Sequence, residues 1–218
     1  MDTPTQTEMP ETDELLTAAA AGQESALAML FDRHRPHLER MIRLRLDSRL
    51  RSRVDPSDIL QETYIAIQRK FPKYVAESDL PLLIWLRLET GQKMVETYRR
   101  HFGTQMRNPA QEISLHRGSF PSVASVTLAA QLLGRVSTAS KALMRTELKL
   151  KVQEALNSME PHDREVLVLR HFEELSNAEV ALMLGISPTA ACNRYVRALK
   201  RLKIAFEEMP GGIEGILS

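Results

Sequence analysis

The sequence has a single cysteine, Cys192, among its 218 residues, and only 5% of its side chains are aromatic. One cysteine excludes an intramolecular disulfide framework and favours a reducing compartment. The longest wholly apolar run, LPLLIWL at residues 80–86, is far shorter than the roughly 20 residues that a membrane-spanning helix needs. The acidic N-terminus also lacks an apolar signal core. We therefore expect a cytoplasmic protein with no membrane insertion.

Patterns typical of enzymes are missing as well. The sequence has no glycine-rich phosphate-binding loop and no nucleophile elbow, and it lacks the period-2 strands that a recombinase catalytic domain would show. His34 and His37 could suggest a metal pair, but no cysteine or paired carboxylate completes a site. We expect no catalytic residues, no metal and no cofactor.

Apolar residues recur at helical spacing, which predicts an all-α fold. Residues 1–13 are acidic and are predicted to be disordered. Two helical domains are predicted, at 14–103 and 139–207, followed by a tail at 208–218. Between them, residues 104–138 are rich in Gly, Ser and Thr, which predicts a flexible linker.

Two prolines are expected to interrupt helices of the first domain. Pro36 lacks an N–H group and clashes one turn back, so a kink or break is expected near it. A second helix is predicted to begin at Pro56 and to end at the Phe71-Pro72 pair. The stretch KYVAESD, residues 73–79, is then predicted to be a loop.

Charge is distributed unevenly, although the formal net charge is only +1. Eight arginines against two acids lie between Arg33 and Arg53, and five basic residues with no acid lie between Arg194 and Lys203. Two basic blocks favour contact with a polyanion at two places, and a solvated helix face is the alternative for each block. The sequence does not decide whether the first block would contact DNA or a protein.

The stretch SNAEVALMLGISPTAACNRY, residues 176–195, predicts two short helices joined at a glycine. Ser176 and Glu179 form a capping box, Gly185 supplies a left-handed end, and Pro188 takes the first position of the second helix. The predicted buried stripe of that second helix is Ala191, Tyr195, Ala198 and Leu202.

The opposite face of this second helix is polar and basic, which is typical of a helix-turn-helix that inserts the helix into the DNA major groove. A helix pair within an ordinary bundle is the alternative. Arg194 is the first candidate for reading a base, whereas side chains from Arg197 onward are expected to hold phosphates. The predicted DNA-binding residues are Thr189, Cys192, Asn193, Arg194, Arg197, Lys200 and Arg201.

Three stretches together resemble the sigma-70 family of transcription initiation factors. The run DPSDILQETYIAI, residues 55–67, resembles the family's region 2 signature. WLRLETGQKMVETYRRH, residues 85–101, is similar to the region 2 helix that meets the −10 promoter element. The stretch from Leu156 to Leu202 is similar to region 4, which reads the −35 element. Their order, with no region 3 domain between them, matches the extracytoplasmic-function (ECF) subfamily.

The resemblance implies a factor that binds core RNA polymerase and directs it to promoters, with 14–103 as region 2 and 139–207 as region 4. It implies that region 2 docks on the coiled coil of the polymerase β′ subunit and that region 4 meets the β flap. An anti-sigma factor is a further candidate partner. The implied docking face, which points away from the apolar stripe of its helix, is Asp58, Gln61, Glu62 and Ile65.

The −10 helix has its own candidates. Lys93, Arg99 and Arg100 are expected to contact phosphates. Trp85 has two alternatives: it is a core residue, or it stacks on an unpaired base where the duplex opens.

A helix-turn-helix regulator with an N-terminal dimerisation or effector domain is the competing hypothesis. It predicts a stable homodimer on palindromic DNA, whereas the sigma hypothesis predicts a monomer that binds core polymerase.

Overall fold

The structure is a computed structural model that describes residues 11–47, 49–102, 112–115, 118–121, 123, 125, 127–129 and 142–207. Within these residues the chain is helical except for one two-stranded hairpin, so the predicted all-α class is confirmed. Most of the segment predicted to be disordered, residues 1–10, and the predicted tail at 208–218 lie outside the described residues. None of the described helices is long and apolar enough to cross a membrane.

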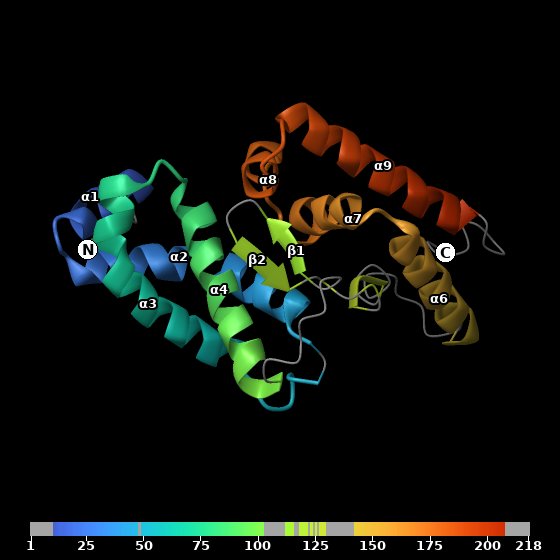
Figure 1. The fold of residues 1–218 in the computed structure, drawn as a ribbon, viewed down its shortest axis with the longest axis horizontal. Coiled ribbons are helices and arrows are strands. Elements are labelled where there is room, and N and C mark those ends of the chain that lie inside the picture. The colour runs from blue at the N-terminus through green and yellow to red at the C-terminus, as the bar shows by residue number, and fades with distance from the viewer. Residues whose placement is uncertain are drawn as a thin grey trace, which may run out of the picture.

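The N-terminal unit consists of four helices that pack around one apolar core (Figure 1). They are α1 (Thr12–Ala20), α2 (Glu24–Arg45), α3 (Pro56–Glu77) and α4 (Leu82–Phe102). Helix α3 begins as predicted, because the Asp55 side chain accepts a hydrogen bond of 2.8 Å from the Ser57 N–H and Pro56 occupies the first position. Tyr98 of α4 fixes the end of α2, since its hydroxyl donates to the Arg45 carbonyl at 2.6 Å.

The predicted end of a helix at Phe71-Pro72 was wrong, and no break occurs at Pro36. Helix α2 continues through Pro36 and α3 continues through Pro72 to Glu77, so most of the predicted 73–79 loop is helical. Apolar burial on both sides of each proline explains the difference. Phe31 and Leu38 flank Pro36 and are buried, and Phe71 and Tyr74 flank Pro72 in the same core. Tertiary packing here outweighs the roughly 3 kcal/mol that an interior proline costs a helix.

The segment predicted to be a flexible linker contains secondary structure. Strands β1 (Glu112–Leu115) and β2 (Gly118–Pro121) pair in antiparallel register, and β2 packs against α4. Beyond the hairpin, Val123 and Leu128 are buried in a second apolar cluster that also contains Leu44 of α2 and Val152 of α6. The described part of 104–138 therefore packs against both units.

The C-terminal unit has four α-helices and one π-helical turn. They are α6 (Ala142–Ser158), α7 (Pro161–Leu167), the π turn η2 (Val168–Phe172), α8 (Asn177–Leu184) and α9 (Pro188–Glu207). The sequence predicted a single helix from Pro161, and the structure ends it in η2. The extra residue of a π turn changes which side chains face inward, and here Glu173 directly after η2 is fully buried.

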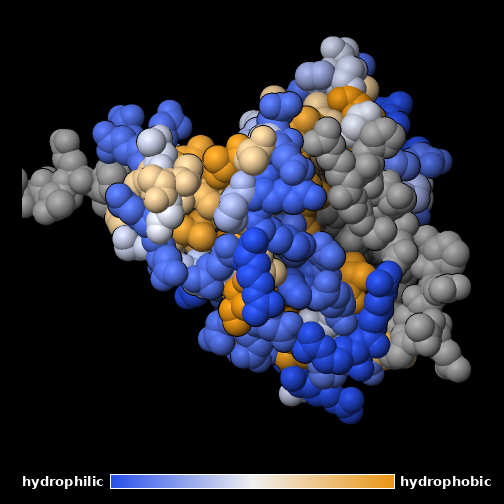
Figure 2. Space-filling model, turned by 60° about the vertical axis from the view of Figure 1, so that its left-hand side comes forward, coloured by the Kyte–Doolittle hydropathy of each residue, from blue (hydrophilic) through white to orange (hydrophobic). Residues whose placement is uncertain are grey.

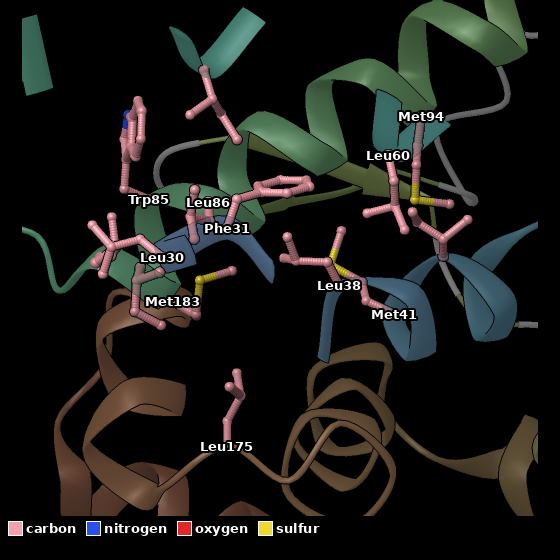
Figure 3. Packing of buried hydrophobic residues seen from close by; sticks show 14 of the residues in the cluster. Leu30, Phe31, Leu38, Met41, Leu60, Trp85, Leu86, Met94, Leu175 and Met183 are labelled. Atoms are coloured by element: carbon pink, nitrogen blue, oxygen red, sulfur yellow. The ribbon is translucent and has the colours of Figure 1, made fainter. Parts of the chain in front are cut away.

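The two units share a hydrophobic core rather than standing apart (Figure 1). Met183 of α8 lies beside Leu30 of α2 in Figure 3, and Leu175 belongs to the same cluster. The sequence placed these residues in separate domains because their helical stripes were assigned to two local cores. The structure joins the two cores across one interface.

A cluster of buried charges crosses the same interface. We call Arg45, Arg87, Glu165 and Glu173 the interunit ion cluster; each is at most 3% exposed. Arg45 at the end of α2 pairs with Glu165 of α7 and with Glu173, whose Oε1 lies 2.9 Å from the Arg45 Nε. Arg87 of α4 pairs with the other Glu173 oxygen. Two arginines of one unit thus meet two glutamates of the other.

Electrostatics within the cluster favour the charged forms. Burial alone would raise the pKa of the Glu173 carboxyl, but the guanidinium groups of Arg45 and Arg87 lower this pKa below its ordinary value. The two glutamates in turn raise the pKa of Arg45 against the opposing effect of burial. The Nε and Nη1 atoms of Arg87 are buried without a hydrogen-bond partner among the described residues.

Removing one member of the cluster should destabilise the whole chain. Glu173→Ala leaves two arginines facing one buried carboxylate, and we expect it to lower the free energy of unfolding by about 3–5 kcal/mol. Urea unfolding followed by circular dichroism measures this. Arg40→Ala is the matched control, because Arg40 and Glu174 form an exposed ion pair across the same interface, for which about 1 kcal/mol or less is expected. Equal losses for both variants would contradict the prediction.

Acid should destabilise the fold through His34 of α2. Burial first, and then the charges of His37 and Arg33, lower the pKa of His34, while Glu179 of α8 opposes them. A lowered pKa means that the unfolded chain binds this proton more tightly than the folded chain. Stability is therefore unaffected well above the ordinary histidine pKa and falls as pH drops through about 6.5. Thermal unfolding between about pH 7.5 and 5.5 should show this loss, and His34→Gln should reduce it. Identical pH profiles for the two proteins would rule out His34 as the cause.

Candidate nucleic-acid and polymerase interfaces

Helices α8 and α9 form the predicted helix pair. The Ser176 N–H donates to Glu179 Oε2 at 2.7 Å and the Glu179 N–H donates to Ser176 Oγ at 3.2 Å, which confirms the capping box. Gly185 has a φ of 63°, as the left-handed end of α8 requires. Asn177 adds a bond that the sequence did not reveal, since its side-chain NH₂ donates to the Pro188 carbonyl at 2.8 Å and ties the two helix starts together.

Helix α9 has the buried and exposed faces that the sequence predicted. Ala191, Ala198 and Leu202 are buried, and Tyr195 is half-buried under Arg170, whose guanidinium lies 5.4 Å from the ring centroid. The predicted DNA-binding residues that are exposed on the other sides are Thr189, Cys192, Asn193, Arg197, Lys200 and Arg201.

The arginines along one side of α9 are held by the rest of the C-terminal unit. Asp163 of α7, only 2% exposed, accepts hydrogen bonds from Arg197 Nε at 3.2 Å and Nη2 at 3.0 Å, and its Oδ1 lies 3.5 Å from Arg194 Nη1. Arg201 donates to the Ser158 carbonyl at 2.6 Å. The Arg194 side chain is 29% exposed and that of Arg197 is 59% exposed. Arg194, the first candidate for reading a base, is thus the less accessible of the two.

A second polar face lies on α3. Asp58, Gln61 and Ile65 are exposed, and Ile65 keeps 50% of its surface accessible. Figure 2 shows hydrophilic side chains over most of the surface in view, with hydrophobic ones in separate patches. An isolated exposed isoleucine is common on protein surfaces, so the exposure of Ile65 alone does not identify a binding site.

One predicted docking residue is bonded to a predicted DNA-binding residue. Both Glu62 oxygens accept hydrogen bonds of 3.0 Å from the Arg100 guanidinium, and this pairing lowers the pKa of the Glu62 carboxyl. Lys93 is 2.6 Å from Glu96 on the same helix, while Arg99 is exposed. The structure therefore links α3 and α4 through residues that the sequence had assigned to different partners.

Trp85 belongs to the core. It is buried in the N-terminal cluster (Figure 3). Its ring stacks on that of Tyr74 with 4.4 Å between the centroids, and its centroid lies 6.0 Å from that of Phe71. Stacking on an unpaired base needs an accessible ring face, and Tyr74 covers one face here. Of the two alternatives, the structure favours the core residue, and the −10 contact suggested for Trp85 is not retained.

The arginine block from Arg33 to Arg53 mostly serves the fold. Seven of its eight arginines make a hydrogen bond or an ion pair, for instance Arg33 to Thr12 and Arg49 to Asp47. His34 and His37 stay without a third ligand: no group of three or more metal-binding side chains occurs among the described residues.

Sequence reasoning missed two residues that bear on the exposed side of α9, the buried Asp163 beside it and Val196 on it. The role of Asp163 could not be inferred from the sequence, because the helix dipole alone explains an acidic residue in the first turn of a helix. Val196 could have been found from the sequence, because it follows Cys192 by four residues and Thr189 by seven, and both lie on the exposed side of α9. In the structure Val196 is exposed. An apolar residue on that side is a feature that helical spacing alone could have revealed.

Comparisons with known proteins agree with this geometry. Residues 149–202 match the family model "Sigma-70, region 4". The chain is 25% identical over 191 residues to the ECF RNA polymerase sigma factor SigD of Mycobacterium bovis and to that of Mycobacterium tuberculosis, which covers 88% of this chain and 82% of each relative. The C-terminal unit thus matches the sigma-70 family, and the chain is similar to ECF sigma factors over most of its length. It is a transcription initiation factor of the ECF type.

The fold of this sigma factor has a solved counterpart. The structure of CnrH in complex with the cytosolic domain of CnrY aligns with a TM-score of 0.53 at 23% identity, over 92% of this chain and 100% of that chain. The SigD relatives align with both units, not only with the helix-turn-helix. The comparisons therefore favour the sigma hypothesis over that of a regulator with an unrelated N-terminal domain.

The position of Trp85 can be tested directly, because it is the only tryptophan of the sigma factor. A ring buried against Tyr74 should emit at short wavelength, resist quenching by acrylamide and shift to longer wavelength on unfolding. Adding single-stranded −10 DNA should leave the emission unchanged. Strong quenching by acrylamide in the folded chain, or by the DNA, would return Trp85 to the DNA-facing alternative.

Proposed function

We propose that this sigma factor binds core RNA polymerase mainly through α3 and contacts promoter DNA through α9 and α4. The observation that supports the proposal best is the pair of exposed polar faces, one on each unit of a sigma-70 family chain. Asp58, Gln61 and Ile65 form the first face, and the exposed side chains of α9 form the second. Neither face is needed for the apolar core, so both are available to partners.

The docking face on α3 suits a helical partner that carries arginines, such as the β′ coiled coil of the polymerase. Asp58 supplies a negative charge, Gln61 supplies both a donor and an acceptor, and Ile65 supplies apolar area at the C-terminal end of the face. Glu62 is already bonded to Arg100, so we assign it to holding α3 against α4 and expect it to contribute to docking through its remaining accessible surface. Region 4 would meet the β flap.

DNA contacts are divided between the two units. On α9, Thr189, Cys192 and Asn193 precede Lys200 along the exposed side, so base contacts are expected nearer the start of the helix and phosphate contacts nearer its end. On α4, Arg99 in the last turn can lie over phosphates, and Arg100 beside it can do so with the part of its guanidinium that the pair with Glu62 leaves accessible. Lys93 contributes only if its ion pair with Glu96 opens.

An anti-sigma protein is a further partner that we propose. CnrH was solved with the cytosolic domain of CnrY. A comparable partner of this chain would cover α3 or α9, because binding to the faces used for polymerase and DNA is the simplest way to block them.

Ile65→Asp should separate docking from folding. The side chain is half-exposed, so stability should change by less than about 0.5 kcal/mol, while affinity for core polymerase should fall at least tenfold. Val75→Asp is the matched control: it lies on the same helix with 44% exposure, outside the docking face. Binding is measured by co-purification with core polymerase and by titration of fluorescent chain.

The same proteins can then be tested in run-off transcription on promoters selected with the wild-type chain. Wild type and Val75→Asp should start transcription at one position, and Ile65→Asp should do so only at high concentration. If Val75→Asp were as defective as Ile65→Asp, α3 would bind elsewhere. If the wild-type chain neither bound core polymerase nor started transcription, the proposed function would be wrong.

A further inference from the structure

The contact between Asp163 and Arg197 leaves one end of the Arg197 side chain free. A guanidinium has five N–H donors, and Asp163 takes one from Nε and one from Nη2, which lie along one edge. The remaining donors, two on Nη1 and one on Nη2, lie at the far end. Since 59% of the Arg197 side chain is exposed, solvent reaches it even though its partner carboxylate is buried.

This free end has the donor arrangement that recognises guanine. Two parallel N–H groups of one arginine bond O6 and N7 of guanine in the major groove, which is the commonest specific contact to DNA. An arginine already held in one rotamer loses less side-chain entropy on binding than a mobile one. Asp163 is itself buried and lies in the first turn of α7, so it is a rigid anchor.

The helix geometry places Arg197 nearer the exposed side of α9 than Arg194. Successive residues of a helix are rotated by about 100°, so residues four positions apart lie on the same side. Arg197 follows Asn193 by four positions and is therefore its neighbour on that side. Arg194 is rotated towards the buried stripe, in agreement with its lower exposure.

We propose that Asp163 is a positioning residue that holds Arg197 as the guanine-reading side chain of α9. The assignment rests on the proposed function of α9, and it exchanges the roles that the sequence suggested for Arg194 and Arg197. Asp163 does not touch DNA in this arrangement. Arg194 completes the charge balance around the buried carboxylate.

The test uses the full chain in complex with core polymerase on a library of −35 variants at two salt concentrations. Arg197→Ala should lower preference at one position of the element by roughly 5- to 150-fold and leave the other positions unchanged. Asp163→Asn should weaken preference at that same position, although it removes no group that could touch DNA. The double variant should be no worse there than Arg197→Ala alone, because both changes remove one contact.

Two further variants separate base reading from phosphate binding. Arg197→Lys keeps the charge on an exposed side chain but lacks the fork, so it should lose the position-specific preference and keep the salt dependence. Lys200→Ala, the phosphate control, should weaken all sequences alike and reduce the salt slope by about one. Arg194→Ala should leave the preference at the Arg197 position intact.

Several results would overturn the inference. An even loss of affinity across the library for Arg197→Ala would make Arg197 a phosphate contact. An unchanged profile of base preference for Asp163→Asn would show that Asp163 does not position Arg197. If Asp163→Asn fails to fold by circular dichroism, Arg197→Lys decides alone, and a retained preference in it counts against guanine reading. If the wild-type chain showed no sequence preference, the proposed function of α9 would be wrong and this inference with it. If the wild-type chain showed a sharp base preference that Asp163→Asn left unchanged, only the inference would be wrong.

Discussion

The interunit ion cluster is the constraint on which the arrangement of the two units depends. Apolar packing within the cluster that contains Met183 and Leu30 tolerates small shifts, because the hydrophobic effect has little direction. The bonds of Arg45 and Arg87 to Glu173 tolerate none, since a displaced partner leaves a charge buried without compensation. Apolar packing brings the two units together, and the ion pairs fix their relative position. The π turn before Glu173 belongs to this requirement, because it delivers that carboxylate to the interface.

Helix α7 connects this cluster to the recognition helix. Glu165 binds Arg45 in the N-terminal unit, and Asp163, two residues earlier, binds Arg197 of α9. Tyr98 of α4 also bonds the Arg45 carbonyl. A short series of direct contacts therefore runs from α4 through α7 to α9. The two helices proposed to meet DNA are thus connected through α7, and on α9 the connecting contact involves Arg197, the side chain proposed to read guanine.

Predictions from the sequence were accurate where the interacting residues lie close together along the chain, and they failed where the residues lie far apart along it. The capping box of Ser176 with Glu179 and the left-handed Gly185 depend on neighbours within a few residues, and both were predicted. The helix end predicted at Pro72 was wrong because local preference suggested a stop, whereas burial of Phe71 and Tyr74 on both sides favours continuing the helix. The pairing of Arg45 with Glu173 spans 128 residues, and no local pattern indicates which of many arginines meets which glutamate.

The same limit explains the recognition surface and the basic blocks. Periodicity identified which side of α9 is exposed, but it could not show that the neighbouring helix places Asp163 beside that side. Counting arginines was equally misleading between Arg33 and Arg53, where most of the guanidinium groups bond within the fold. With a net charge of only +1, the chain as a whole is not strongly attracted to DNA, so the proposed DNA contacts depend on where the exposed basic groups lie. On α9 these include Lys200 and the outer end of Arg197, so the proposed recognition depends on the orientation of single side chains rather than on total charge.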